Sequence, residues 1–132
     1  MFFKSSRNIL NLNGIVMIIL GLIFIIFPED FTLFTFPKTT DNPVALEVGV
    51  ISRIIMGAFS IYIGLVLYSS RKLIRSGAQK LLLVSSLGFF IIFCACVYVF
   101  IINNSIIHII GLFIFPLLSL LSLYVATRKF QN

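Results

Sequence analysis

Acidic residues are scarce in this 132-residue sequence and absent from its long apolar runs. The four present, Glu29, Asp30, Asp41 and Glu47, all fall in one polar segment of residues 28–47. Transport of protons through acidic relays needs carboxylates inside the membrane spans. The sequence therefore excludes that mechanism.

Histidine and cysteine are rarer still. The single histidine, His108, cannot make a multi-histidine metal site or a haem pair. Cys94 and Cys96 are two residues apart, so a helix directs them about 200° from each other and they cannot pair or chelate one ion. No phosphate loop, nucleophile elbow or zinc-protease motif occurs. We expect no catalytic residue, no metal and no cofactor, although the sequence leaves open whether the protein is an enzyme.

Apolar residues, by contrast, make up 60% of the chain, and only 11% of residues are charged. About a quarter of residues are charged in soluble proteins. A chain of this size cannot enclose so many apolar side chains in one core, so we expect the lipid bilayer to cover most of its surface. The net charge is +6, but the basic residues flank the apolar runs, which argues against nucleic acid as a partner.

Four apolar runs of about 20 residues predict four transmembrane helices. They cover residues 9–27, 48–68, 81–102 and 106–126, with an outer loop of residues 28–47 after the first. The first run is longer than a signal-peptide core and lacks a small-residue cleavage site before Pro28, so we interpret it as a retained helix. The predicted fold is all-α, with residues 1–132 forming one integral membrane domain, a four-transmembrane-helix bundle.

Basic residues predict the orientation of this bundle. Lysine and arginine cluster before the first span, between the second and third spans, and after the fourth. With four spans, these three segments lie on one side of the membrane and all the acidic residues lie on the other. The positive-inside rule assigns the basic side to the cytoplasm. We therefore expect a multi-pass protein of the cell inner (plasma) membrane with both termini cytoplasmic.

Small residues recur at helical spacing in each span, as they do where membrane helices pack together. The predicted helix-packing residues are Gly49, Gly57, Ser60 and Gly64 in the second span and Gly111, Ser119 and Ser122 in the fourth. The corresponding residues are Gly14 and Gly21 in the first span and Ser85, Gly88 and Ala95 in the third. We expect Asn11 and Asn13 to lie at the cytoplasmic interface of the membrane.

Arg53 is the one charged residue inside a predicted span, about five residues or about 8 Å below its outer end. Its spacing from the glycines directs it into the bundle. Two interpretations stay open for a charge at this depth: a site for an anion or polar headgroup, or a structural arginine tied to carboxylates or carbonyls of the outer loop. His108 enters near the same level, as a packing residue or as part of the same site.

The hypothetical binding site beneath the outer surface consists of Arg53, His108, Glu29, Asp30, Asn103 and Asn104. It is inferred from depth and helix facing alone. The loop above it carries several phenylalanines between Pro28 and Pro37. These form a lid over a ligand or lie on the membrane interface.

The segment Arg53-Ile54-Ile55-Met56-Gly57, followed by Gly64, resembles the helix signature of DoxX-like proteins and their uncharacterised four-helix bacterial relatives. The resemblance implies an inner-membrane bundle, in some members associated with redox or quinone-linked partners. It supplies no active-site residue.

Three functions fit this sequence. The first is non-enzymatic binding as an accessory subunit or scaffold of a membrane assembly, with another membrane protein or further copies of the chain as partner. The second is an oligomeric transporter or channel for a small solute, built around an outer-leaflet pocket of Arg53 and His108. The third is a quinone-linked membrane redox component. We favour the first, because the most regular features of the chain are its packing faces.

Overall fold

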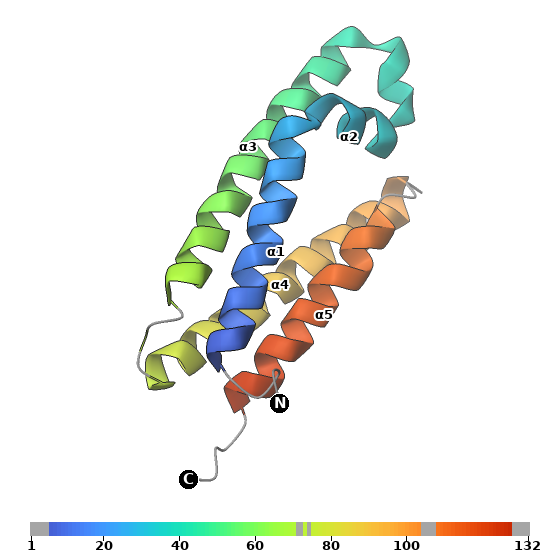
Figure 1. The fold of residues 1–132 in the computed structure, drawn as a ribbon. Helices are drawn as coiled ribbons and strands as arrows, with labels where there is room; N and C mark the ends of the chain where they lie inside the picture. Colours follow the sequence, from blue (N-terminus) through green and yellow to red (C-terminus); the bar gives the residue numbers. More distant parts are fainter. Residues whose placement is uncertain (1–5, 71–72, 74, 104–107, 128–132) are drawn as a thin grey trace.

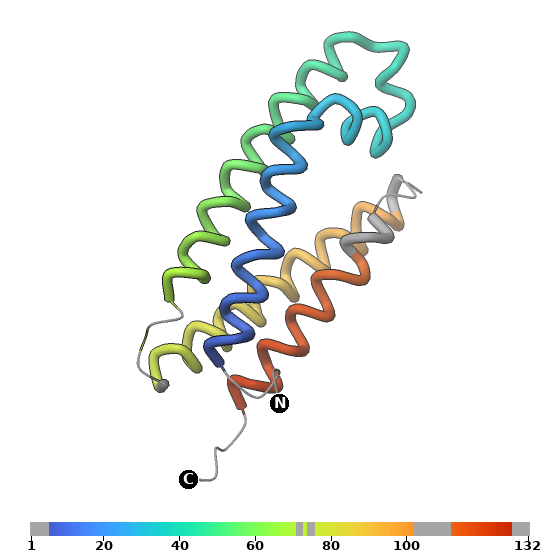
Figure 2. Tube along the Cα trace, in the orientation of Figure 1, coloured from blue at the N-terminus to red at the C-terminus, as the bar shows by residue number. Residues whose placement is uncertain are grey.

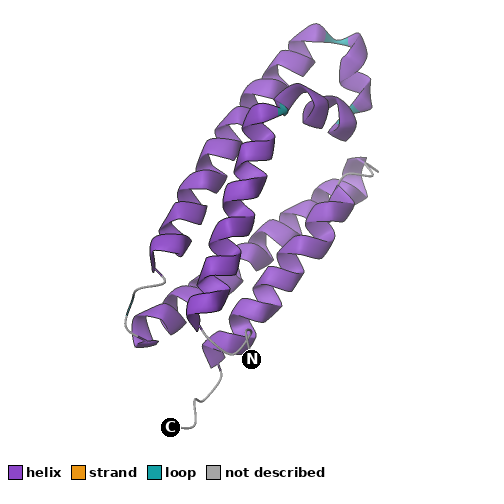
Figure 3. Cartoon of the chain, viewed as in Figure 1, coloured by secondary structure: helices purple, strands orange, loops and turns teal. Residues whose placement is uncertain are grey.

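A computed structural model describes residues 6–70, 73, 75–103 and 108–127, and only the backbone for 75, 102–103 and 108–111. Within these ranges the chain forms five α-helices and one 3-10 helix and has no strand (Figure 3). The predicted all-α class is therefore confirmed.

Three helices are long and apolar enough to cross a membrane, by length and composition. They are α1 (Ser6–Ile26), α3 (Pro43–Ser69) and, within α4 (Arg75–Asn103), the section Ser76–Ile101. In α5 (His108–Thr127) the apolar section Leu112–Thr127 is shorter. The helices α1, α3 and α4 start three to six residues before the predicted spans, because hydropathy marks the apolar stretch and a helix continues into its polar flanks.

The segment predicted as an outer loop, residues 28–47, is mostly helical. It contains α2 (Pro28–Thr35), the 3-10 helix η2 (Pro37–Asp41) and the first turn of α3. All three helices have a proline in the first turn, where its fixed φ suits a helix and its missing N–H is not needed. The prolines therefore divide the segment into short helices in place of an irregular loop.

The long helices form two antiparallel hairpins, α1 with α3 and α4 with α5 (Figures 1 and 2). In the first hairpin, a Cβ on Gly14 would lie 2.8 Å from the carbonyl oxygen of Gly64. A Cβ on Gly21 would lie 2.6 Å from the carbonyl oxygen of Gly57. No side chain fits at these distances, so the four glycines bring the two helix backbones into direct contact.

Side chains close the second hairpin. The Ser86 hydroxyl lies 3.0 Å from the carbonyl oxygen of Ser119, and the Ser119 hydroxyl donates back to the carbonyl oxygen of Ser86 at 2.9 Å. One turn along each helix, the rings of Phe89 and Phe115 stack with centroids 6.3 Å apart. The α4–α5 contact is therefore a polar pair followed by an aromatic pair.

The two hairpins pack against each other mainly at the end where α1 begins and α5 finishes, and they diverge toward the other end (Figure 1). The buried apolar side chains gather toward this closed end, between the start and the middle of α1 and of α4, near the end of α3 and in the second half of α5. They are Ile9, Leu10, Met17, Leu67, Ala78, Leu82, Phe89, Leu118 and Val125. The core is therefore asymmetric along the helix axes.

Asn13 lies inside this core and not at a membrane interface as expected. Its side chain is fully buried, and its amide nitrogen donates to the Ser122 hydroxyl at 2.7 Å. The expectation was wrong because it considered only how far Asn13 lies from the end of its own helix. Packing of α5 over this position removes it from both water and lipid.

The packing face predicted for α4 was also wrong. Leu82, Ser86 and Phe89 point into the chain, whereas Ser85 and Gly88 are only half-buried and Ala95 is exposed. Both faces of α4 carry small residues at helical spacing. The interior face is the one that also carries a large apolar residue on either side of its serine.

Candidate functional site

Arg53 lies on α3, one turn away from each of Gly49 and Gly57. It is half-buried, and its Nη2 donates a hydrogen bond to the Thr35 hydroxyl of α2 at 2.7 Å. That hydroxyl is buried and itself donates to the carbonyl oxygen of Phe31 at 2.5 Å. Because the Thr35 hydroxyl donates its proton within α2, its oxygen can accept a hydrogen bond from the guanidinium.

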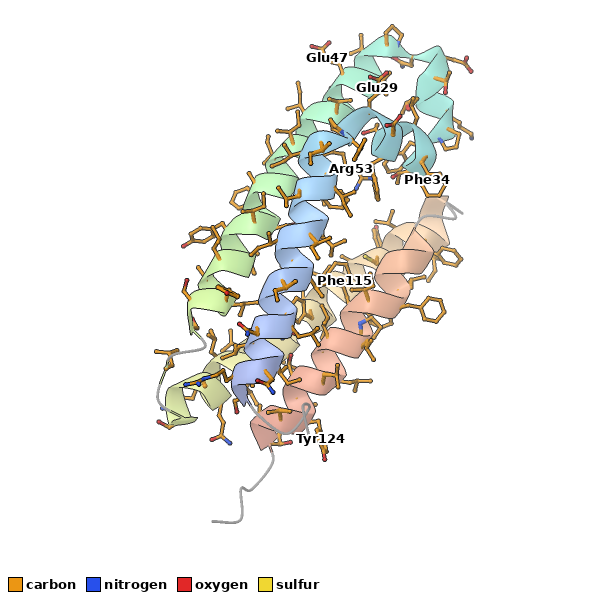
Figure 4. All side chains as sticks on the ribbon, in the orientation of Figure 1. Glu29, Phe34, Glu47, Arg53, Phe115 and Tyr124 are labelled. Atoms are coloured by element: carbon orange, nitrogen blue, oxygen red, sulfur yellow. The ribbon has the colours of Figure 1, made fainter. Side chains whose placement is uncertain are left out.

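Two aromatic rings hold the other side of the guanidinium. Its Cζ lies 5.4 Å from the ring centroid of Phe24 on α1 and 6.0 Å from that of Phe31 on α2. The rings meet edge to face, with centroids 5.1 Å apart. Both distances fall within the range of cation–π attraction. Figure 4 shows Arg53 beneath α2, at the end where the hairpins diverge. We call Arg53, Thr35, Phe24 and Phe31 the arginine cluster.

The position of α2 over Arg53 depends on a second threonine. Thr32 is buried against Gly49 of α3, where an added Cβ would collide with its methyl group. Its hydroxyl donates to the carbonyl oxygen of Pro28 at 2.7 Å, so the buried polar atom is satisfied within α2. Thr32 and Thr35 are three residues apart and share one face of the helix. Docking of Thr32 on Gly49 therefore brings Thr35 to the guanidinium.

The structure gives Arg53 a hydroxyl and two rings in place of the carboxylates considered for it. Glu29 and Asp30 are exposed in the first turn of α2, where a negative charge interacts favourably with the helix dipole. Among the residues described, neither forms an ion pair with Arg53. Glu29 and Asp30 therefore precede the arginine cluster in the sequence, but they do not contact the Arg53 guanidinium.

The remaining predicted site residues fall where side chains are not described. Asn103 ends α4 and His108 begins α5, whereas Asn104 lies outside the described residues. The convergence of these three with Arg53 stays a prediction. Of the predicted packing residues, Gly111 is described by its backbone alone, Ser60 is half-buried, and Ser119 and Ser122 take part in the buried hydrogen bonds above.

Sequence reasoning missed Thr35 and Phe24 as partners of Arg53. The first could have been found, because Pro28-Glu29-Asp30 is a typical helix start and places Thr32 and Thr35 on one face. The second had no signal, since Phe24 is one apolar residue among many in its span.

The chemistry available at the arginine cluster is the binding of an anion. A guanidinium has five N–H donors, and within the described chain one of them, on Nη2, has a protein acceptor. The same part of the chain holds no group of three or more histidine, cysteine, aspartate or glutamate side chains that could bind a metal ion. The cation is held in place, and its charge is not neutralised by a described acid.

A second surface feature is the outward face of α4. Val84, Gly88, Ile91, Ala95 and Tyr98 follow each other at steps of four, three, four and three residues, which keeps them on one side of a helix. Val84 is 63% exposed and Ile91 and Tyr98 are each 67% exposed. A Cβ on Gly88 would meet nothing within 4 Å. We call these five residues the outer α4 face.

Gly88 and Ala95 are seven residues apart, as are Gly14 and Gly21 on α1 and Gly57 and Gly64 on α3. The spacing that brings α1 and α3 into backbone contact thus recurs on a face that no described part of this chain covers.

No protein-family model, no curated protein and no solved structure matches this chain. The resemblance to DoxX-like proteins therefore stays a prediction, and functional inference rests on the geometry of the arginine cluster and of the outer α4 face.

Proposed function

We propose that the chain is a non-enzymatic four-span protein of the inner membrane that acts as an accessory subunit or scaffold of a membrane assembly. The observation that carries this proposal is the outer α4 face. Apolar burial drives no association between helices in lipid, so helices associate where small residues permit close packing. A small-residue face without an occupant in its own chain suits another helix, from a partner protein or from a second copy.

The proposed topology has both termini on the cytoplasmic side. In support of it, the start of α1 and the end of α5 lie at the same end of the molecule (Figure 2). Arg7 and Lys80, both exposed, belong to the first two turns of α1 and α4 at this end. The four acidic residues belong to α2, η2 and the start of α3. The 20 residues of α5 would extend about 30 Å, enough for a fourth span.

Purification from the native membrane in mild detergent, followed by mass spectrometry of what is retained, tests the proposal. A partner or a second copy should accompany the parent chain. Gly88→Leu should release it, because the new side chain occupies the space that the partner helix needs. Gly77→Leu is the matched control: it adds the same side chain to α4, at a position where a Cβ meets only Leu73, at 3.8 Å. The proposal fails if the parent chain emerges alone or if the two variants behave alike.

The native cysteines distinguish a second copy from a different protein. Cys94 is exposed next to Ala95, whereas Cys96 is half-buried. If two copies meet through this face, mild oxidation in membranes should link them through Cys94 into a species of twice the mass. Cys94→Ser should abolish that species and Cys96→Ser should preserve it. Absence of the species in the parent chain, despite a retained partner, would indicate a different protein.

A further inference from the structure

The depth of Arg53 follows from the length of α3. This helix has 27 residues and is about 40 Å long, whereas the hydrocarbon core of a bilayer is about 30 Å thick. Some of the helix therefore lies outside the core. The polar residues of η2 and the acidic residues around it indicate that the end of α3 near Pro43 is the part that lies outside the core.

The guanidinium lies closer to that surface than its own Cα does. Side chains on a helix lean toward its N-terminus, which for α3 is the end covered by α2. The hydrogen bond from Arg53 to Thr35 of α2 shows the same direction. A long basic side chain can reach the headgroup layer in this way while its methylenes stay in apolar surroundings. The guanidinium is thus directed toward the level of lipid phosphates.

The contacts of the guanidinium fix its position without removing its charge. Thr35 takes one hydrogen bond, and the rings of Phe24 and Phe31 add cation–π attraction. All four acidic side chains at this end are exposed, and no described one is ion-paired with Arg53. A planar cation whose remaining donors meet no acceptor among the described residues, held beside apolar rings, matches a phosphate, which accepts two parallel N–H bonds from arginine.

We propose that the arginine cluster binds a phosphate-bearing anion, with the headgroup of an anionic phospholipid in the leaflet around α2 as its ligand. Arg53 supplies the donors, Thr35 orients them, and the two rings exclude water from one side of the cation. This inference rests on the proposed insertion of the chain in a membrane and is independent of any partner at the outer α4 face.

The sequence contains no tryptophan, so Phe24→Trp introduces a single fluorescent reporter that also preserves the cation–π contact. The full chain with this substitution is reconstituted in phosphatidylcholine vesicles that contain a small fraction of phosphatidylglycerol with brominated acyl chains. Bromine quenches indole fluorescence at short range, so quenching measures how often the anionic lipid occupies the site.

Brominated phosphatidylglycerol should quench the indole more than brominated phosphatidylcholine does at the same fraction, with an apparent preference of roughly fivefold for one basic group. Arg53→Gln should remove this preference. Arg53→Lys should reduce it without abolishing it, because an ammonium retains the charge but not the paired donors. Lys38→Gln is the matched control, since Lys38 is an exposed base at the same end of the molecule. It should leave the preference unchanged.

A second arm identifies the source of the phosphate. Inorganic phosphate is added to the parent protein, with sodium chloride at equal ionic strength as the control. If phosphate displaces the brominated lipid, sodium chloride does not, and the displacement depends on Arg53, the site takes the free anion. If neither salt displaces the lipid, the lipid headgroup is the ligand. Equal quenching in the parent chain and in Arg53→Gln overturns the proposal.

If Arg53→Gln fails to fold, the lipid preference of Arg53→Lys tests the proposal instead. A preference that is the same in Arg53→Lys, in Lys38→Gln and in the parent chain would then overturn the proposal. Gly88→Leu in the same vesicles separates this inference from the proposed function, because loss of a partner at the outer α4 face should leave the lipid preference intact.

Discussion

The α1–α3 hairpin is closed by backbone against backbone, whereas the α4–α5 hairpin is closed by side chains. Gly14 and Gly21 bring α1 so near to α3 that a single added carbon would lie 2.6–2.8 Å from a carbonyl oxygen. In α4–α5, the contact is made by the Ser86 and Ser119 hydroxyls and by the Phe89 and Phe115 rings. Lipid provides no hydrophobic drive between helices, so each hairpin needs one of these two specific contacts.

The two kinds of contact should respond differently to substitution. A contact between two helix backbones leaves no room for a side chain, so any added side chain disrupts it, whatever the chemistry of that side chain. A side-chain contact can lose one hydrogen bond and keep the rest. The α1–α3 hairpin should therefore be the more sensitive to small changes in sequence.

The largest effect is expected from Gly21→Ala. Its Cβ would lie 2.6 Å from the carbonyl oxygen of Gly57, so the helices must separate, and overpacking of this kind costs about 3 kcal/mol. Gly88→Ala is the control, because nothing lies within 4 Å of the new carbon and alanine favours a helix by about 1 kcal/mol over glycine. Unfolding in mixed detergent micelles, followed by circular dichroism, measures both. Equal destabilisation by the two variants would contradict the backbone-contact interpretation.

A smaller effect is expected where the two hairpins join. Ser122→Ala leaves the buried amide nitrogen of Asn13 without its acceptor, which costs about 1–2 kcal/mol for an unsatisfied buried donor. Asn13→Leu should cost less, because leucine removes the amide nitrogen together with Asn13 Oδ1, which already lacks a hydrogen-bond partner among the described atoms. Only the Ser122 hydroxyl then loses a partner. The same unfolding assay compares them. A larger loss for Asn13→Leu than for Ser122→Ala would show that asparagine contributes more than this one bond.

The smallest effect is expected for the serine pair of α4–α5. A double-mutant cycle of Ser86→Ala and Ser119→Ala isolates the contact between the two hydroxyls, 3.3 Å apart, because each variant retains its backbone carbonyl. The coupling energy should be at most about 0.6 kcal/mol, the average found for hydrogen bonds between membrane helices. Phe89 and Phe115 continue to hold the helices in every variant of the cycle. A coupling as large as the loss from Gly21→Ala would remove the distinction between the two hairpins.

The glycine contacts were predictable from sequence because they depend only on spacing and size. Gly57 and Gly64, seven residues apart, were expected to share a packing face with Arg53, and all three point toward α1 or α2. The direction of Arg53 into the fold was predictable for the same reason. The residues around Arg53 were not predictable. They come from α1 and α2, and the spacing of residues within α3 does not reveal where those helices lie.

Asn13 and the interior face of α4 show where sequence reasoning ends. Whether an asparagine near a helix end meets water or a serine depends on which helix packs over it, here α5, more than 100 residues later in the chain. On α4, both Ser85-Gly88 and Ser86-Phe89 satisfy the same helical spacing. Only the packing of the whole chain selects which of the two faces is interior.

The separation of the chain into two hairpins also has a consequence for the order of assembly during synthesis. The glycine contacts of the first hairpin are complete once α3 has been made, before α4 begins, and they use no residue of the second. The bond from Asn13 to Ser122 spans 109 residues of sequence and forms only when the second hairpin docks. Until then the Asn13 amide lacks the Ser122 acceptor. Docking of the second hairpin is therefore the step that both buries Asn13 and supplies its acceptor.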